Sequence, residues 1–97
     1  MLHPSRDQID LLEVLAALGH PVRAQIVRAL AGGEERFCGE VVPGVPKSTL
    51  TAHWRVLREA GVICQRPEGR KLFIRLRRDD LDARFPGLVD LLLREDL

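Results

Sequence analysis

The chain has 97 residues, of which 45% are hydrophobic and 4% aromatic, so we predict one globular domain with an aliphatic core. No apolar run approaches the roughly 18 residues of a membrane span, and the start MLHPSRDQ lacks a signal-peptide pattern, so we expect a soluble cytoplasmic protein. The net charge is only +1, yet residues 47–78 carry nine Lys or Arg against two Asp or Glu. Such a basic block between acidic ends is typical of a protein that binds a phosphate-bearing partner. The alternative is a basic face that is only solvated.

The chain before residue 46 predicts two helices, a short helical segment and a turn. The first helix covers residues 7–18, where apolar side chains recur at helical spacing. His20 is a candidate N-cap of the second helix, which begins at Pro21 and ends at a Gly-Gly pair. Residues 36–42 are expected to form one or two helical turns, and PGVP follows as a turn.

The second half predicts a helix, a β-hairpin and a last helix. The helix covers about 46–60, and the strands cover about 62–66 and 71–77 with PEGR as their turn. The last helix covers about 80–94, where Pro86 marks a kink or a restart. The resulting order, α-α-α-α-β-β-α, is that of a winged helix-turn-helix, a mainly α fold with a small β-hairpin.

The helix over residues 46–60 has a polar, cationic tip, which a helix that only fills a core does not need. Leu50, Trp54 and Leu57 are spaced to hold it on its scaffold, while short side chains at the tip can reach base edges in the DNA major groove. The candidate DNA contacts of this helix are Lys47, Ser48, Thr49, Thr51, Ala52 and Arg55. Taken singly, these residues have a plainer interpretation as helix-start donors and solvated charges.

The hairpin predicts a second DNA contact. Arg66, Arg70 and Lys71 surround its Gly-containing turn over residues 66–71, where they can reach phosphates or a minor groove. The alternative is a hairpin with solubilising charges, and Glu68 at the tip weakens the basic character.

Three stretches of the chain resemble the ArsR/SmtB family of small bacterial winged-helix repressors. They are ALGHPVRAQIVRAL (17–30), KSTLTAHWRVLREAGVI (47–63) and EGRKLFIRL (68–76). The run TAHWRVLREAGVI follows the family pattern S-x-H-L-x-x-L-x-x-A-G-L-V nearly position by position, with Trp54 in place of Leu. Pro46 departs from the Ser that the family often has there. The resemblance implies a homodimeric repressor that pairs through its first and last helices and binds an inverted-repeat operator in double-stranded DNA.

The two end helices are consistent with this implication, because both carry apolar residues on more than one face. We therefore expect residues 1–97 to form one DNA-binding domain, with the helices at about 7–18 and 80–94 forming the dimer interface. The expected interface residues are Ile9, Leu12, Leu15, Leu88 and Leu92. The alternative is that the end helices pack on each other within one protomer.

The sequence predicts no metal site, no cofactor and no enzyme. Metal-binding members of the resembled family carry a C-V-C motif in the short third helix, where this chain has Phe37 and Gly39 at the cysteine positions. The last predicted helix has no His, so the usual ligand spacing is absent. Cys38 and Cys64 are expected to be inert thiols, and a thiol-redox-responsive regulator is one alternative. A winged-helix module that binds protein is the other, which the polar helix tip disfavours.

Overall fold

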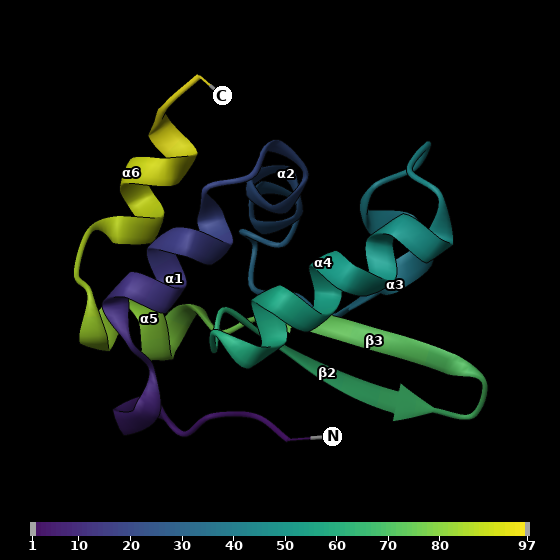
Figure 1. Cartoon of the computed structure of the whole chain (residues 1–97), viewed down its shortest axis with the longest axis horizontal. Helices are drawn as coiled ribbons and strands as arrows, with labels where there is room; N and C mark the ends of the chain where they lie inside the picture. The colour runs from purple at the N-terminus through teal and green to yellow at the C-terminus, as the bar shows by residue number, and fades with distance from the viewer. Residues whose placement is uncertain (1, 97) are drawn as a thin grey trace.

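The computed structural model describes residues 2–96, so residues 1 and 97 of the predicted domain lie outside the described part. The described elements are η1 (Arg6–Gln8), α1 (Leu11–Leu18), α2 (Pro21–Ala29), β1 (Arg36–Phe37), α3 (Cys38–Val41), α4 (Lys47–Glu59), β2 (Ile63–Glu68), β3 (Lys71–Leu76), α5 (Arg78–Arg84) and α6 (Leu88–Arg94). Figure 1 shows α1, α5 and α6 on one side of α4 and the β2–β3 hairpin projecting on the other. This is a winged helix-turn-helix, as the sequence predicted.

The first predicted helix is divided in the structure. Ile9 is extended between η1 and α1, and Asp10 caps α1 by accepting a hydrogen bond from the Glu13 backbone N–H at 3.2 Å. The break lets the Ile9 side chain enter the core, where it is 2% exposed. Burial of a large aliphatic side chain thus outweighs the one helical turn that is lost.

Residues 36–42 form a strand as well as the expected helical turn. β1 pairs antiparallel with β3, with Arg36 opposite Ile74 and Phe37 opposite Phe73, and α3 follows directly. The sheet order is β1-β3-β2, which makes β3 the central strand. The wing is therefore hydrogen-bonded to the segment that leads into the helix-turn-helix.

The last predicted helix restarts after Pro86, as α5 and α6. Gly87 precedes α6 with φ of +87°, a left-handed conformation that an L-residue with a side chain rarely adopts. The chain therefore turns sharply between the two helices, as Figure 1 shows.

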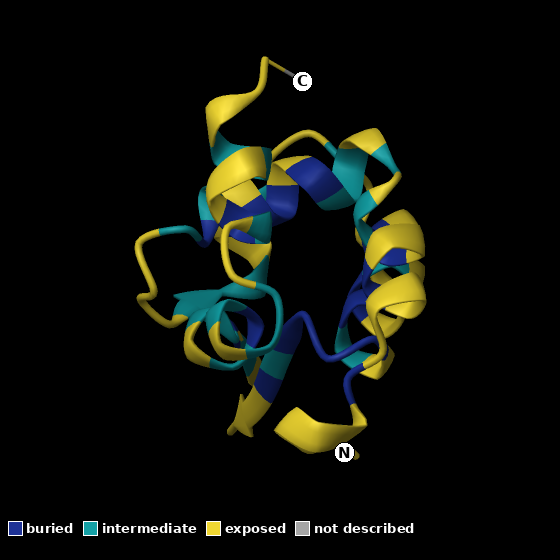
Figure 2. Cartoon of the chain, turned by 90° about the vertical axis from the view of Figure 1, so that its left-hand side faces the viewer, coloured by how far each residue is buried: buried dark blue, intermediate teal, exposed yellow. Residues whose placement is uncertain are grey.

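The core is aliphatic apart from Trp54, and every helix longer than four residues contributes to it. Figure 2 shows buried residues mainly on the inner sides of the elements. Its largest fully buried side chains are Ile9, Ile26, Leu30, Leu57, Ile63, Ile74, Leu76 and Leu81. Within residues 2–96, no helix is both long and apolar enough to cross a membrane.

Gly61 ends α4 and fixes the direction of β2. Its φ is +84°, and the N–H groups of Gly61 and Val62 donate to the Arg58 and Leu57 carbonyls at 3.0 and 2.9 Å. This bond pair is the Schellman arrangement of a helix C-terminus. A Cβ added at Gly61 would lie 2.6 Å from Cγ1 of Ile9, so the backbone here packs directly on the buried N-terminal segment.

Candidate nucleic-acid interface

The tip of α4 presents its polar residues to solvent while the rear of the helix is buried. Leu50, Trp54 and Leu57 lie in the core, as predicted. All six candidate contacts on this helix are exposed: Lys47, Ser48, Thr49, Thr51, Ala52 and Arg55. Pro46 occupies the N-cap position, where no side chain caps the helix. The first-turn N–H groups of α4 are therefore available to an anion.

Two candidate residues of α4 have intramolecular partners. The Thr51 hydroxyl donates to the Lys47 carbonyl at 3.1 Å, which leaves its oxygen free to accept a further hydrogen bond. Arg55 pairs with Glu59 at 3.2 Å, and both side chains are largely exposed. An exposed pair of this kind is weak and salt-sensitive, so Arg55 can exchange its carboxylate for a phosphate.

Arg23 of α2 fixes α4 against the first two helices. Its Nε donates to the Ala17 carbonyl at 2.6 Å, at the end of α1, and its Nη1 donates to Nδ1 of His53 at 3.2 Å. Burial lowers the pKa of His53, and the neighbouring His20 and Arg23 charges lower it further. His53 is thus an internal hydrogen-bond acceptor. His20 accepts the Val22 N–H at 3.1 Å and is the predicted cap of α2.

A second set of bonds ties the rear of α4 to the sheet and the N-terminal segment. Arg58 donates to the buried Gln65 side chain at 2.7 Å, and the Gln65 N–H donates to Nε2 of His3 at 3.0 Å. Burial lowers the pKa of His3, and the charges of Arg77 and Arg58 lower it further. Because His3 accepts through Nε2, this link requires a neutral ring.

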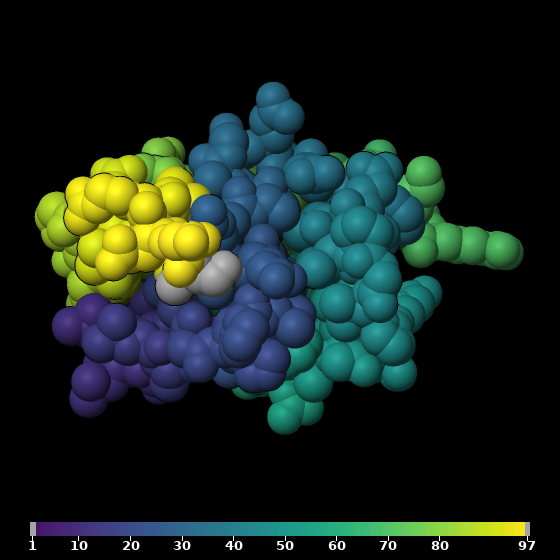
Figure 3. Space-filling view, turned by 90° about the horizontal axis from the view of Figure 1, so that it is seen from above, coloured from purple at the N-terminus to yellow at the C-terminus, as the bar shows by residue number. Residues whose placement is uncertain are grey.

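Arg70 stands at the tip of the wing, in the turn between β2 and β3. Glu68 of β2 lies opposite Lys71 of β3 in the strand register, so Gly69 and Arg70 form a two-residue turn. Gly69 has the positive φ (+61°) that such a turn requires. Across residues 2–96, the structure gives Arg70 no ion pair. Figure 3 shows the hairpin as a projection beyond the rest of the surface.

Arg66, in contrast, is held by two carboxylates. Its Nε and Nη2 atoms donate to both oxygens of Glu35 at 3.0 and 2.6 Å, and its Nη1 donates to Glu68 at 3.0 Å. These hydrogen bonds raise the pKa of Arg66, and the bond from Arg66 lowers the pKa of Glu35. Lys71 lies with Nζ 5.3 Å from the centre of the Phe37 ring. The three basic residues predicted for the wing therefore differ in their availability.

The structure also assigns the predicted dimer residues to two environments. The expectation for Ile9 is wrong, because its side chain is used inside the protomer core. Leu12 and Leu15 are 72% and 45% exposed, and Leu88 and Leu92 are half-buried. Leu91, which the sequence prediction missed, is 45% exposed. A groove of about 220 Å³ between α1 and α6 is lined by Leu15, Leu18, Gly19, Leu88, Leu91, Leu92 and Glu95.

Several residues that shape the site were missed in the sequence. Glu35 is brought to Arg66 by the pairing of β1 with β3, for which a two-residue strand gives no periodic signal. Arg23 lies within one of the stretches that carry the family resemblance, which was its only signal. Cys38 and Cys64 are free and half-buried. The described residues contain no group of three or more His, Cys, Asp or Glu that could hold a metal.

Comparisons with known proteins agree with this geometry. Residues 18–66, from the end of α1 into β2, match the family described as "Helix-turn-helix domain". The chain is also 35% identical over 91 residues to the "Uncharacterized HTH-type transcriptional regulator YceK" of Bacillus subtilis (strain 168), a match that covers 91% of this chain and 90% of that protein. Both similarities indicate a DNA-binding protein and not an enzyme. The chain belongs to the helix-turn-helix domain family and is a DNA-binding transcriptional regulator.

Proposed function

We propose that this regulator is a cytoplasmic, homodimeric repressor of the ArsR/SmtB type that binds an inverted-repeat operator through α4 and the wing. The observation that carries the proposal is the polar tip of α4, where Lys47, Thr51 and Ala52 are exposed. This tip lies on the same side of the molecule as the turn of the β2–β3 hairpin (Figure 1), which contains Arg70. No acidic residue lies between Lys47 and Arg58 on this helix. An interface of this kind suits a polyanion better than a protein surface.

The contacts have distinct roles in this proposal. Lys47 and the free N–H groups of the first α4 turn hold a phosphate, and Ser48 and Thr49 add short donors beside it. Thr51 and Ala52 face the base edges, where a hydroxyl or methyl group distinguishes base pairs. Arg70 contacts the backbone or the minor groove from the wing, whereas Arg66 and Lys71 stabilise the hairpin and add positive potential.

Dimerisation is proposed to use the exposed leucines of the end helices. The exposed Leu15 and Leu91 line the groove between α1 and α6 together with the half-buried Leu88 and Leu92, and Leu12 is exposed on the same helix as Leu15. A self-complementary apolar face of this kind suits a two-fold dimer. That symmetry would place the two α4 helices in successive major grooves, with half-sites about 34–36 Å apart.

The test is a fluorescence-anisotropy titration against DNA from upstream of the protein's own gene. Scrambled DNA of the same composition is the control, and the stoichiometry is read from a titration well above Kd. Lys47→Ala should weaken binding. Arg94→Ala removes an equivalent charge from the end of α6, far from the tip of α4, and should not weaken it. Because α6 belongs to the proposed dimer interface, the mass of this variant is measured by light scattering and should equal that of the unaltered protein. Preference for the native fragment with two chains per site supports the proposal. Equal binding to both fragments contradicts operator specificity, and one chain per site contradicts the dimer.

A further inference from the structure

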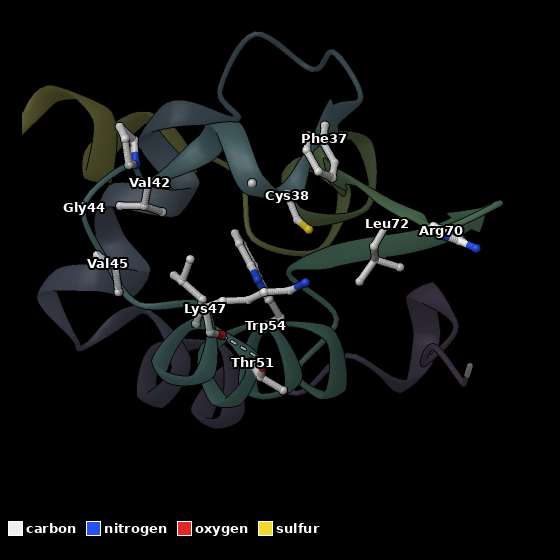
Figure 4. A pocket seen from close by; sticks show the side chains of 13 residues that line it. Phe37, Cys38, Val42, Gly44, Val45, Lys47, Thr51, Trp54, Arg70 and Leu72 are labelled. Carbon is white, nitrogen blue, oxygen red and sulfur yellow. Dashed lines mark hydrogen bonds between the residues drawn. The ribbon is translucent and has the colours of Figure 1, made fainter.

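An apolar hollow of about 350 Å³ lies between α3, the loop before α4, the tip of α4 and the wing (Figure 4). Cys38 and Val42 line one side, Leu50 and Trp54 of α4 the opposite side, and Leu72 of β3 the wing side. This volume is at the lower end of the roughly 300–1,000 Å³ typical of ligand pockets. It fits one small molecule with an apolar body.

The charges at the mouth of the hollow are of one sign. Lys47 and Arg70 belong to its lining, and no Asp or Glu does. Neither cation takes part in an ion pair with any residue from 2 to 96. Figure 4 shows Lys47 extending across the hollow in front of Trp54, while Arg70 at the rim points toward solvent. The Thr51 hydroxyl also lines the mouth and can still accept a hydrogen bond.

We propose that this hollow binds a small amphipathic carboxylic acid. Its apolar body lies against Trp54, Cys38 and Leu72, and its carboxylate is bound by Lys47, with Arg70 within reach at the rim. A cation would be repelled by the same two residues. A neutral molecule of the same shape would gain the apolar contacts but leave Lys47 without a counter-ion, so the site selects for an anion.

The proposal gives the acid a regulatory effect that rests on the proposed function. Lys47 is also the residue assigned to a phosphate of the operator. One ammonium group that is paired with a bound carboxylate adds little attraction for a phosphate, and the ligand itself brings a negative charge to the α4 tip. Acid and operator DNA therefore exclude each other, and the acid releases the regulator from DNA.

Trp54 provides a direct readout that needs no DNA. It is the only Trp of the chain, which has no Tyr, so the emission comes from Trp54 alone, and Trp54 lines the hollow. Octanoate and 3-phenylpropanoate are the probes, and 1-octanol is the uncharged control. We expect saturable changes in Trp54 emission with both acids, and binding of octanoate roughly two- to fivefold tighter than that of 1-octanol, as one exposed ion pair allows.

Variants separate the apolar from the ionic part of the site. Lys47→Gln should remove the preference for octanoate over 1-octanol, and Arg94→Gln, a charge-matched control on α6, should retain it. Cys38→Met fills part of the hollow and should weaken the binding of octanoate, 3-phenylpropanoate and 1-octanol. Lys47 is exposed, so its substitution leaves the fold intact and keeps the test valid even if Cys38→Met fails to fold.

A lack of saturable change with either acid would overturn the proposal, as would equal binding of octanoate and 1-octanol to the unaltered protein. The regulatory effect is tested by adding octanoate to the protein–operator complex, which should dissociate. A complex that is unaffected at saturating octanoate overturns mutual exclusion. If the protein binds no DNA while the Trp54 titration succeeds, the proposed function fails and the ligand site stands.

Discussion

The wing offers the sharpest test of how ion pairing inside the protein controls its contacts with DNA. Arg66 and Arg70 lie four residues apart in one hairpin, but Arg66 is bound by Glu35 and Glu68 while Arg70 stands at the tip. We expect Arg70→Ala to reduce DNA affinity and its salt dependence. Arg66→Ala should change both much less, because its charge is already compensated.

The magnitude follows from counter-ion release. Each phosphate contact contributes a slope of about −0.9 in log Kobs against log salt concentration. A dimer has two wings, so Arg70→Ala should reduce the steepness of the slope by about 1.8. Between 50 and 200 mM salt this corresponds to a difference of roughly tenfold, with the larger loss of affinity at low salt.

The assay is an anisotropy titration on operator DNA at four salt concentrations between those limits. Glu35→Gln combined with Glu68→Gln is the complementary variant, because it releases Arg66 and should steepen the slope. Equal changes in slope for Arg66→Ala and Arg70→Ala would refute the reasoning. The reasoning would also be refuted if the variant with Glu35→Gln and Glu68→Gln had the same slope as the unaltered protein.

Three further predictions concern stability and assembly. Gly61→Ala should lower the free energy of unfolding by about 2–4 kcal/mol, because the cost of a positive φ and the cost of overpacking against the core add up. Gly33 also has a positive φ but faces open space, so Gly33→Ala should lower the free energy of unfolding by only about 1 kcal/mol in the same urea titration. Equal losses for the two variants would contradict the packing argument. The folded-state pKa of His3 lies below its unfolded value of about 6.5, so its contribution to stability is present above pH 6.5 and is lost as the pH falls through the folded-state pKa. The melting temperature of the protein should therefore fall between pH 7 and pH 5, and it should fall by less in His3→Gln. An identical fall in that variant would show that His3 does not cause the pH dependence. Leu12→Glu with Leu91→Glu should convert the proposed dimer to a folded monomer in light scattering, and an unchanged mass would place the interface elsewhere.

The helices and the hairpin could be predicted because their signals are local. α4 combines a stripe of Leu50, Trp54 and Leu57 with a polar tip, and the wing strands flank a Gly-containing turn. β1 could not be predicted, since two residues show no periodicity and its partner strand comes much later in the chain. Ile9 continues the helical spacing of its neighbours in sequence, but Gly61 leaves room for it in the core.

The sequence names candidate residues for the site, but it does not show which partners each of them has in the fold. Sequence shows that Arg66, Arg70 and Lys71 are basic. It does not show that Glu35 reaches Arg66 or that Lys71 lies over Phe37, because both contacts depend on the pairing of β1 with β3. The apolar hollow could not be predicted from the sequence either, because its walls come from α3, α4 and the wing, which are brought together only in the fold.

The N-terminal segment has a consequence for how the protein is made. His3 accepts a hydrogen bond from Gln65, the Pro4 carbonyl accepts one from Arg77, and Ile9 packs beneath Gly61. Chains leave the ribosome from the N-terminus, so these early residues emerge well before the residues that bury and bind them. Contacts this distant in sequence also form slowly. The core of this domain can therefore close only after the wing and the residues beyond it have been synthesised.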